Sequence, residues 1–137
     1  MTALPVRRLR DMSITTRVMS VSVEVADQDK ALTFYRDVLG SELRTDLEVW
    51  PGARLVEVVP PGSSVAIALL TRASGLPIGV RYITGDAEEA HRALIAAGVT
   101  PNQQVLYTDF APPMFTLDDP DGNTVILIQD SGDAHDG

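Results

Sequence analysis

An internal repeat sets the strictest limit on how this chain can fold. The alternating run MSVSVEV (19–25) is followed by Asp27 and by the amphipathic stretch DQDKALTFYRDVLG. In the second half, a strand-like run at 78–84 is followed by Asp86 and by DAEEAHRALIAAG. Aspartate accepts hydrogen bonds from the free amides of a helix N-terminus, and glycine favours the left-handed conformation that ends a helix. A repeat of about 60 residues indicates a duplicated folding module.

Three further strand-like runs follow each predicted helix, and turns rich in Pro and Gly separate several of them. They are predicted at 42–50, 54–59 and 65–70 in the first half and at 104–107, 114–117 and 124–129 in the second. We therefore predict an α+β fold of two tandem βαβββ modules, 18–72 and 73–130, with mostly antiparallel sheets that form a concave cleft. The prediction adds a flexible N-terminal tail, 1–17, and a disordered acidic tail, 131–137.

Alternation along the predicted strands assigns their side chains to two faces, because successive residues of a strand point to opposite sides. In the first module, one face carries the three valines at 21, 23 and 25, which we expect to pack under the first helix. The other face carries Ser20, Ser22 and Glu24, which we expect in the cleft. In the second module, the residues expected on the cleft side include Gly79, Arg81 and Ile126.

Composition narrows the classes of partner. The chain has 137 residues, is 45% apolar and carries a net charge of −8, so it can bury a core and repels nucleic acid and anionic lipid. It has no long apolar run, which argues against a membrane span. It has no cysteine, which excludes disulfides and thiolate chemistry and favours a cytoplasmic location. A negative surface favours cationic ligands.

Three segments carry a resemblance to a known family: VEVADQDKALTFYRDVLGSEL (23–43), GDAEEAHRALIAAGV (85–99) and FTLDDPDGNTVILIQ (115–129). With them the chain resembles the vicinal oxygen chelate superfamily, the group of glyoxalase I, bleomycin-resistance proteins and extradiol dioxygenases. The resemblance implies the glyoxalase/bleomycin-resistance fold and a homodimer. Substrates within such a superfamily vary widely, so the fold alone says little about chemistry.

Enzymes of this superfamily usually hold a divalent metal, and the resemblance places the corresponding positions at Ser20, Gly79 and Ile126. The remaining position lies in 65–70, which contains no carboxylate, histidine or glutamine. A divalent ion needs several nitrogen or oxygen donors at about 2.0–2.6 Å. We therefore predict no metal and no cofactor. The two histidines, His91 and His135, are expected on the surface.

Glu24 is the strongest single candidate in the predicted cleft. It could act as a general base or as the counter-charge of a cationic ligand, and in a purely structural role it could pair with Arg81. Arg81 could instead anchor a carboxylate or phosphate of the ligand. The further candidates are polar residues of the third strand and aromatic or soft apolar residues that could stack on a planar ligand or fill a core or dimer contact: Arg54, Glu57, Trp50, Tyr107, Phe110 and Met114.

These candidates favour a metal-independent, small-molecule binding protein that holds an aromatic or cationic organic ligand in the cleft between the modules. The segment YTDFAPPMF (107–115) is the predicted lid. One alternative is a metal-free lyase or isomerase with Glu24 as base, which would require burial to raise the pKa of Glu24. The other is a dioxygenase-related or other metal enzyme with displaced ligands.

Overall fold

The computed structural model describes residues 14–131, which divide into two compact units: residues 19–80, and residues 14–18 together with 81–131. Most of the two predicted tails lies outside the described residues. Residues 14–17 and 131 are exceptions, and β1 (Arg17–Glu24) already includes residue 17. The module boundary predicted at 72/73 stays a prediction, since these units are grouped by packing and not by repeat. No helix in residues 14–131 is long and apolar enough to cross a membrane.

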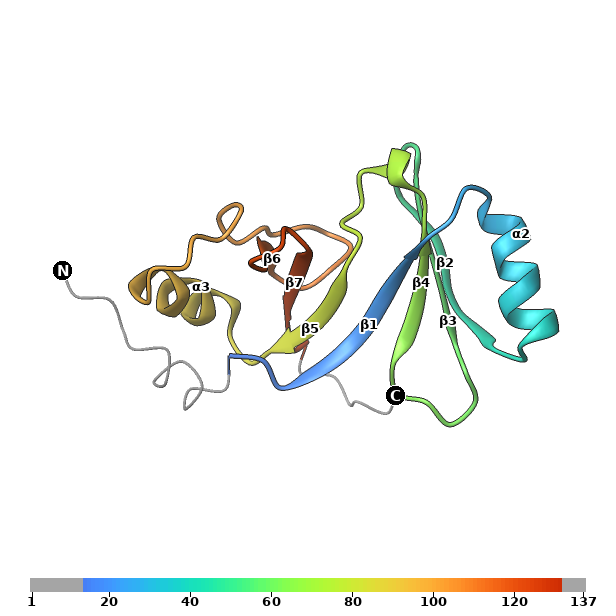
Figure 1. Ribbon diagram of the computed structural model, residues 1–137, viewed down its shortest axis with the longest axis horizontal. Helices are drawn as coiled ribbons and strands as arrows, with labels where there is room; N and C mark the ends of the chain where they lie inside the picture. Colours follow the sequence, from blue (N-terminus) through green and yellow to red (C-terminus); the bar gives the residue numbers. More distant parts are fainter. Residues whose placement is uncertain (1–13, 132–137) are drawn as a thin grey trace. The chain divides into compact units, whose positions relative to one another are not determined.

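The unit of residues 19–80 is built from four strands in the order β2-β3-β4-β1. β1 runs parallel to β4, whereas β2–β3 and β3–β4 are antiparallel pairs. α2 lies against β3 and β4 (Figure 1). The remaining elements of this unit are α2 (Gln28–Thr33), the π-helix η1 (Phe34–Val38), β2 (Glu42–Trp50), β3 (Ala53–Val59), β4 (Ala66–Leu70) and the 3-10 helix η2 (Arg72–Ser74).

The core under α2 follows the predicted alternation. Leu32 of α2 packs with Val56 and Leu69 of β3 and β4, and Val23 of β1 borders this cluster. Because Ser22 neighbours Val23 along the strand, its side chain points to the opposite face. That second face carries its own smaller apolar cluster, centred on the buried residues Ala53, Ala68, Leu70 and Leu76.

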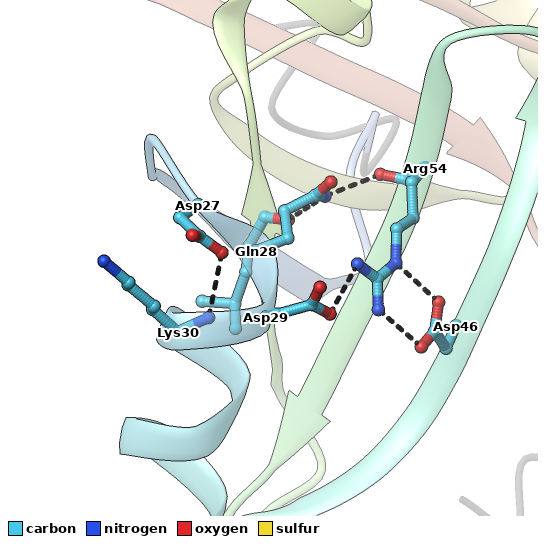
Figure 2. A network of polar contacts seen from close by, with 7 residues as sticks. Asp27, Gln28, Asp29, Lys30, Asp46 and Arg54 are labelled. Carbon is cyan, nitrogen blue, oxygen red and sulfur yellow. Dashed lines mark hydrogen bonds and ion pairs between the residues drawn. The ribbon is translucent and has the colours of Figure 1, made fainter.

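The start of α2 is fixed to the sheet by polar contacts. Asp27 caps the helix, as predicted, by accepting from the Lys30 amide at 3.0 Å. Gln28 Nε2 donates to the main-chain oxygens of Arg54 and Leu69, each at 2.8 Å. Figure 2 shows Arg54 reaching from β3 to Asp29 in the first turn of α2 and to Asp46 on β2. Helix, edge strand and sheet interior are therefore joined at one point.

The second unit contains β5 (Val80–Thr84), α3 (Ala87–Ala96), β6 (Met114–Asp118) and β7 (Thr124–Gln129), with the strands in the order β5-β7-β6. α3 packs on β6 and β7. Its buried residues, among them Ala90 and Leu94, share a core with Phe115 and Leu127. Asp86 caps α3, as predicted, by accepting from the Glu89 amide at 3.1 Å.

The strand predicted at 104–107 is wrong, because only Leu106 makes a bridge to Met114 there. Just before residue 104, side chains make hydrogen bonds to β6 that the backbone of a regular strand would make. Gln103 Oε1 accepts from the Thr116 main-chain amide at 2.7 Å, and Asn102 Nδ2 donates to Thr116 Oγ1 at 2.8 Å. The outer edge of β6 is therefore covered without a regular ladder.

The expectation that His91 faces solvent is also wrong. His91 is only 5% exposed and belongs to the inner side of α3. Its Nε2 lies 2.8 Å from the Gln103 oxygen, and its ring meets Phe115 edge-on with centroids 4.9 Å apart. His91 is thus a core residue that ties α3 to the segment leading to β6.

Candidate functional site

The strand register of residues 19–80 aligns one row of side chains across the face away from α2. Thr45 pairs with Glu57, Glu57 with Ala68, and Ala68 with Ser22. Cross-strand partners point to the same side of a sheet, so these four side chains share the face that carries the smaller apolar cluster. The Ser22 amide is fixed by a 3.0 Å hydrogen bond to the Gly79 oxygen.

Glu57 is the buried charge of this row. Its side chain is 6% exposed, and Arg44 Nη2 lies 3.1 Å from Glu57 Oε1. The pairing of β2 with β3 shifts register between Leu43 and Thr45, so β2 is irregular at Arg44. Arg44 directly precedes Thr45, which is the residue opposite Glu57. A buried carboxylate requires a compensating cation, and Arg44 supplies it. Because 36% of the Arg44 side chain is exposed, this cation remains within reach of solvent.

Ser22 carries the second polar group of the row. Its hydroxyl is shielded from solvent and has no hydrogen-bond partner in the part of the chain that the structure describes. An unpaired buried hydroxyl is costly, so such groups need an explanation, and a bound ligand is one. Ala68, which lies between Glu57 and Ser22, is fully buried in the smaller apolar cluster. Glu57, Ala68 and Ser22 therefore form the candidate site.

Glu24 lies at the end of the same face and has an arginine partner within its own unit. Its carboxylate accepts from Arg72, with Arg72 Nη2 2.6 Å from Glu24 Oε1. The hydrogen bond from Arg72 lowers the pKa of Glu24, and burial opposes this only in part. A general base at neutral pH would need a raised pKa. The contact with Arg72 therefore favours a binding or structural role for Glu24.

Arg54 does not face the same side as Ser22, so that expectation is wrong. It precedes Leu55 and Val56 on β3, and Val56 packs under α2. Strand alternation thus places Arg54 on the helix side, where it pairs with Asp46 at 2.9 Å and with Asp29 at 2.8 Å. Two residues of opposite parity, Arg54 and Glu57, cannot both face one side, and the sequence pattern alone did not decide between them.

Trp50 ends β2 next to the smaller apolar cluster. It is partly exposed, and a β-carbon added at Gly75 would lie 4.0 Å from the indole Cζ2. Residues 72–76 therefore run close to the indole ring. Because Trp50 pairs with Ala53, a member of this cluster, the indole lies beside an apolar patch on the candidate face.

The remaining predicted residues belong to the second unit. Arg81 and Ile126 are buried, and Ile126 has no exposed surface. Tyr107 is exposed, and its hydroxyl donates to Glu88 on α3, which raises the pKa of Tyr107 through that hydrogen bond. Tyr107 is thus bound to the helix. Phe110 is exposed in the loop before β6, and Met114, the first residue of β6, is half-buried.

The positions that the resemblance assigned to metal ligands do not fit a divalent ion in this chain. Ser20 offers a fully buried hydroxyl, Gly79 has no side chain, and Ile126 is apolar. β4 reads AIALL and offers no donor side chain. Within residues 14–131, no three side chains of His, Asp or Glu gather closely enough to hold a metal ion.

Arg44 and Arg72 are the residues that the sequence analysis missed. Each neutralises a predicted glutamate, but the pairs join residues far apart in the chain. Arg72 lies 48 positions from Glu24. No local pattern connects such residues. The register shift of β2 at Arg44 likewise leaves no signal in the sequence.

Comparisons with known proteins identify the family. The model of the Glyoxalase/Bleomycin resistance protein/Dioxygenase superfamily matches residues 17–127. The chain belongs to this superfamily, which confirms the resemblance and the predicted α+β fold of glyoxalase type. Among curated proteins, none matches the chain.

The chain is also similar to several solved structures. A superfamily member from Sphaerobacter thermophilus DSM 20745 is 34% identical over 84% of this chain and 98% of its own, with a TM-score of 0.41. Methylmalonyl-CoA epimerase from Mycobacterium tuberculosis is 22% identical over 86% of this chain and 90% of its own, with a TM-score of 0.72. TnmS3, an antibiotic binding protein from Streptomyces sp. CB03234, is 28% identical over 85% of this chain and 97% of its own, with a TM-score of 0.39.

Proposed function

We propose that this chain is a metal-independent binding protein for an aromatic or cationic organic molecule. The single observation that carries the proposal is the row in which a buried carboxylate, Glu57, and an unpartnered buried hydroxyl, Ser22, flank the small residue Ala68. The row supplies two polar groups that can fix the orientation of a ligand. The neighbouring apolar cluster supplies surface that a planar molecule can cover.

The charge of the row favours a cation. Glu57 is buried and must stay paired, whereas Arg44 is partly exposed and can move into solvent. A ligand that displaces Arg44 therefore has to bring its own positive charge. The net charge of −8 adds a long-range attraction for such a ligand. A cytoplasmic location and a homodimer complete the proposal.

Isothermal titration with matched ligands tests the proposal. 9-Aminoacridine, a planar cation at pH 7.5, is compared with acridine, its largely neutral counterpart at that pH, and bleomycin is included because the superfamily description names it. We expect the cation to bind and Glu57→Gln to weaken it about 10- to 100-fold, the range for losing a hydrogen bond to a charged group. Acridine affinity should change little.

Asp121→Asn is the control, because it removes one exposed carboxylate in the turn between β6 and β7. It should leave the dissociation constant unchanged. The chain's single tryptophan, Trp50, gives a second readout, since a ligand on the neighbouring apolar cluster should change its fluorescence. Failure of every cation to bind, or equal weakening by Asp121→Asn, would contradict the proposal.

A further inference from the structure

Strand β2 departs from regular pairing a second time near its end. Besides the shift at Arg44, its pairing with β3 shifts register between Glu48 and Trp50. At such a bulge, two residues of one strand lie opposite one residue of the partner. Trp50 is opposite Ala53, and Val49, the extra residue, packs against the same smaller apolar cluster. The bulge therefore turns two neighbouring apolar side chains toward the candidate face, where a regular strand would turn one.

Leu47 lies between the two bulges and faces the same side. It is opposite Leu55, which packs against the smaller apolar cluster. Its neighbour Asp46 points to the helix side instead, where Figure 2 shows it paired with Arg54. Leu47 is 45% exposed and Trp50 is 39% exposed. Leu47, Leu55 and Trp50 thus give the candidate face an accessible apolar surface, which we call the apolar platform.

The apolar platform begins one step along the strands from the buried carboxylate. Leu55 and Glu57 are two residues apart on β3, so they share a face and lie about 7 Å apart along the strand. Leu47 and Thr45, their partners on β2, repeat this spacing. One face of the sheet therefore carries a buried anion and, beside it, an exposed apolar surface that includes an indole ring.

We infer that the ligand is a primary arylalkylammonium ion, with its ring on the apolar platform and its ammonium group at Glu57. This inference rests on the function proposed above and names the class of ligand. An aromatic ring suits the platform, because flat rings bury much area and stack on an indole. An ammonium group suits Glu57, because its donors form charge-assisted hydrogen bonds with a carboxylate. The separation of about 7 Å between the two contacts calls for a chain of three or four methylene groups between ring and nitrogen.

Calorimetric titration of the full chain with ω-phenylalkylammonium ions tests this spacing. The probes run from one to six methylene groups and carry the same ring and the same charge. We expect the affinity to reach a maximum at three or four methylenes. Butylammonium, which has no ring, and 4-phenylbutanol, which has no charge, should each bind at least about tenfold more weakly than 4-phenylbutylammonium. An affinity that keeps rising to six methylenes would show general hydrophobic attraction and would overturn the inference.

Two leucines of β2 give a matched pair of variants for the ring contact. Leu47→Ser should weaken 4-phenylbutylammonium about three- to tenfold and leave butylammonium unchanged, because it removes apolar contact with the ring alone. Leu43→Ser is the control. Leu43 is 43% exposed on the same strand, but it lies opposite Val58, which packs under α2 on the other face. Leu43→Ser should leave both affinities unchanged.

The outcomes separate this inference from the proposed function. If 9-aminoacridine binds through Glu57 while Leu47→Ser and Leu43→Ser weaken 4-phenylbutylammonium equally, the inference is overturned and the proposed function stands. If Glu57→Gln leaves the affinities of 9-aminoacridine and 4-phenylbutylammonium unchanged, the proposed function fails and the inference fails with it.

Discussion

Arg44 Nη2 lies 3.1 Å from Glu57 Oε1, and this contact joins a partly exposed cation to a buried anion. The asymmetry matters for stability as well as for binding. Arg44 is the partner that the buried carboxylate needs in the free protein, and it is also the partner that a cationic ligand would replace. The first prediction follows from the stability of this pair.

Arg44→Met should destabilise the protein by about 2 kcal/mol, because it leaves the buried carboxylate of Glu57 without a partner. The loss should stay below that of a fully buried pair, since part of Arg44 is in solvent. Urea denaturation of both proteins measures the difference. Arg36→Met, which breaks the exposed pair of Arg36 with Asp37, is the control and should leave the midpoint unchanged. Equal midpoints for Arg44→Met and wild type would contradict the prediction.

Asp46→Asn should make stability less dependent on pH in the acid range. Hydrogen bonding to Arg54 lowers the pKa of Asp46 below its usual 3.8. A carboxyl group whose pKa is lower in the folded state stabilises that state at pH values above its ordinary, unfolded pKa. This stabilisation is lost as the pH falls through the pKa of the folded state. The free energy of unfolding of the wild type should therefore exceed that of the variant by about 1 kcal/mol at pH 6. This difference should shrink below pH 3.8.

Chemical denaturation at several pH values measures this difference. Asp121→Asn controls for the loss of one carboxylate, because Asp121 is exposed in a turn. A gap between wild type and Asp46→Asn that stays constant down to pH 2 would show that the contact with Arg54 does not contribute.

His91→Ala should cost about 2–3 kcal/mol of stability, since it removes a buried ring and its contact with the Gln103 oxygen. Arg92→Ala changes the next residue, which is exposed, and should stay within about 0.5 kcal/mol of wild type. Thermal unfolding of the two variants compares them directly. A solvent-facing histidine, which the sequence pattern predicted, would make both variants equally mild.

Glu88→Gln should move the titration of Tyr107. The hydrogen bond to Glu88 raises the pKa of Tyr107 above 10.0, so the contact stabilises the fold below that pH and is lost as pH rises. In the variant, the pKa should fall toward 10.0. The ultraviolet absorbance of tyrosinate measures it, and the difference spectrum against Tyr107→Phe isolates this residue from the other tyrosines. An unchanged pKa would mean that Tyr107 is not bound to α3.

Local rules were enough for much of the fold. The valine alternation, the two aspartate caps and glycine at helix ends all act within a few residues, and the structure confirms each of them. Gly40 and Gly98, for example, have φ values of 81° and 88°, the left-handed conformation that the repeat predicted. Each of these features depends on residues that are close together in the sequence, so it can be predicted from the sequence alone.

The errors arise where distant residues decide the outcome. The sequence pattern placed His91 on the surface, because it could not show that the His91 ring meets a carbonyl on a later segment. It predicted a strand at 104–107 because it could not foresee that the Gln103 side chain would bind the Thr116 amide. The pairing of Glu57 with Arg44 likewise depends on strand register and on an irregularity in β2.

The central claim is that a cationic ligand takes the place of Arg44 at Glu57, and the dissociation constant of 9-aminoacridine for Arg44→Gln tests it most directly. Removing the competing cation should tighten binding about two- to fivefold, the contribution expected of a partly exposed ion pair. Few variants of a binding site improve affinity, so the sign of this change is diagnostic. An affinity that is unchanged or weaker in Arg44→Gln would contradict the account.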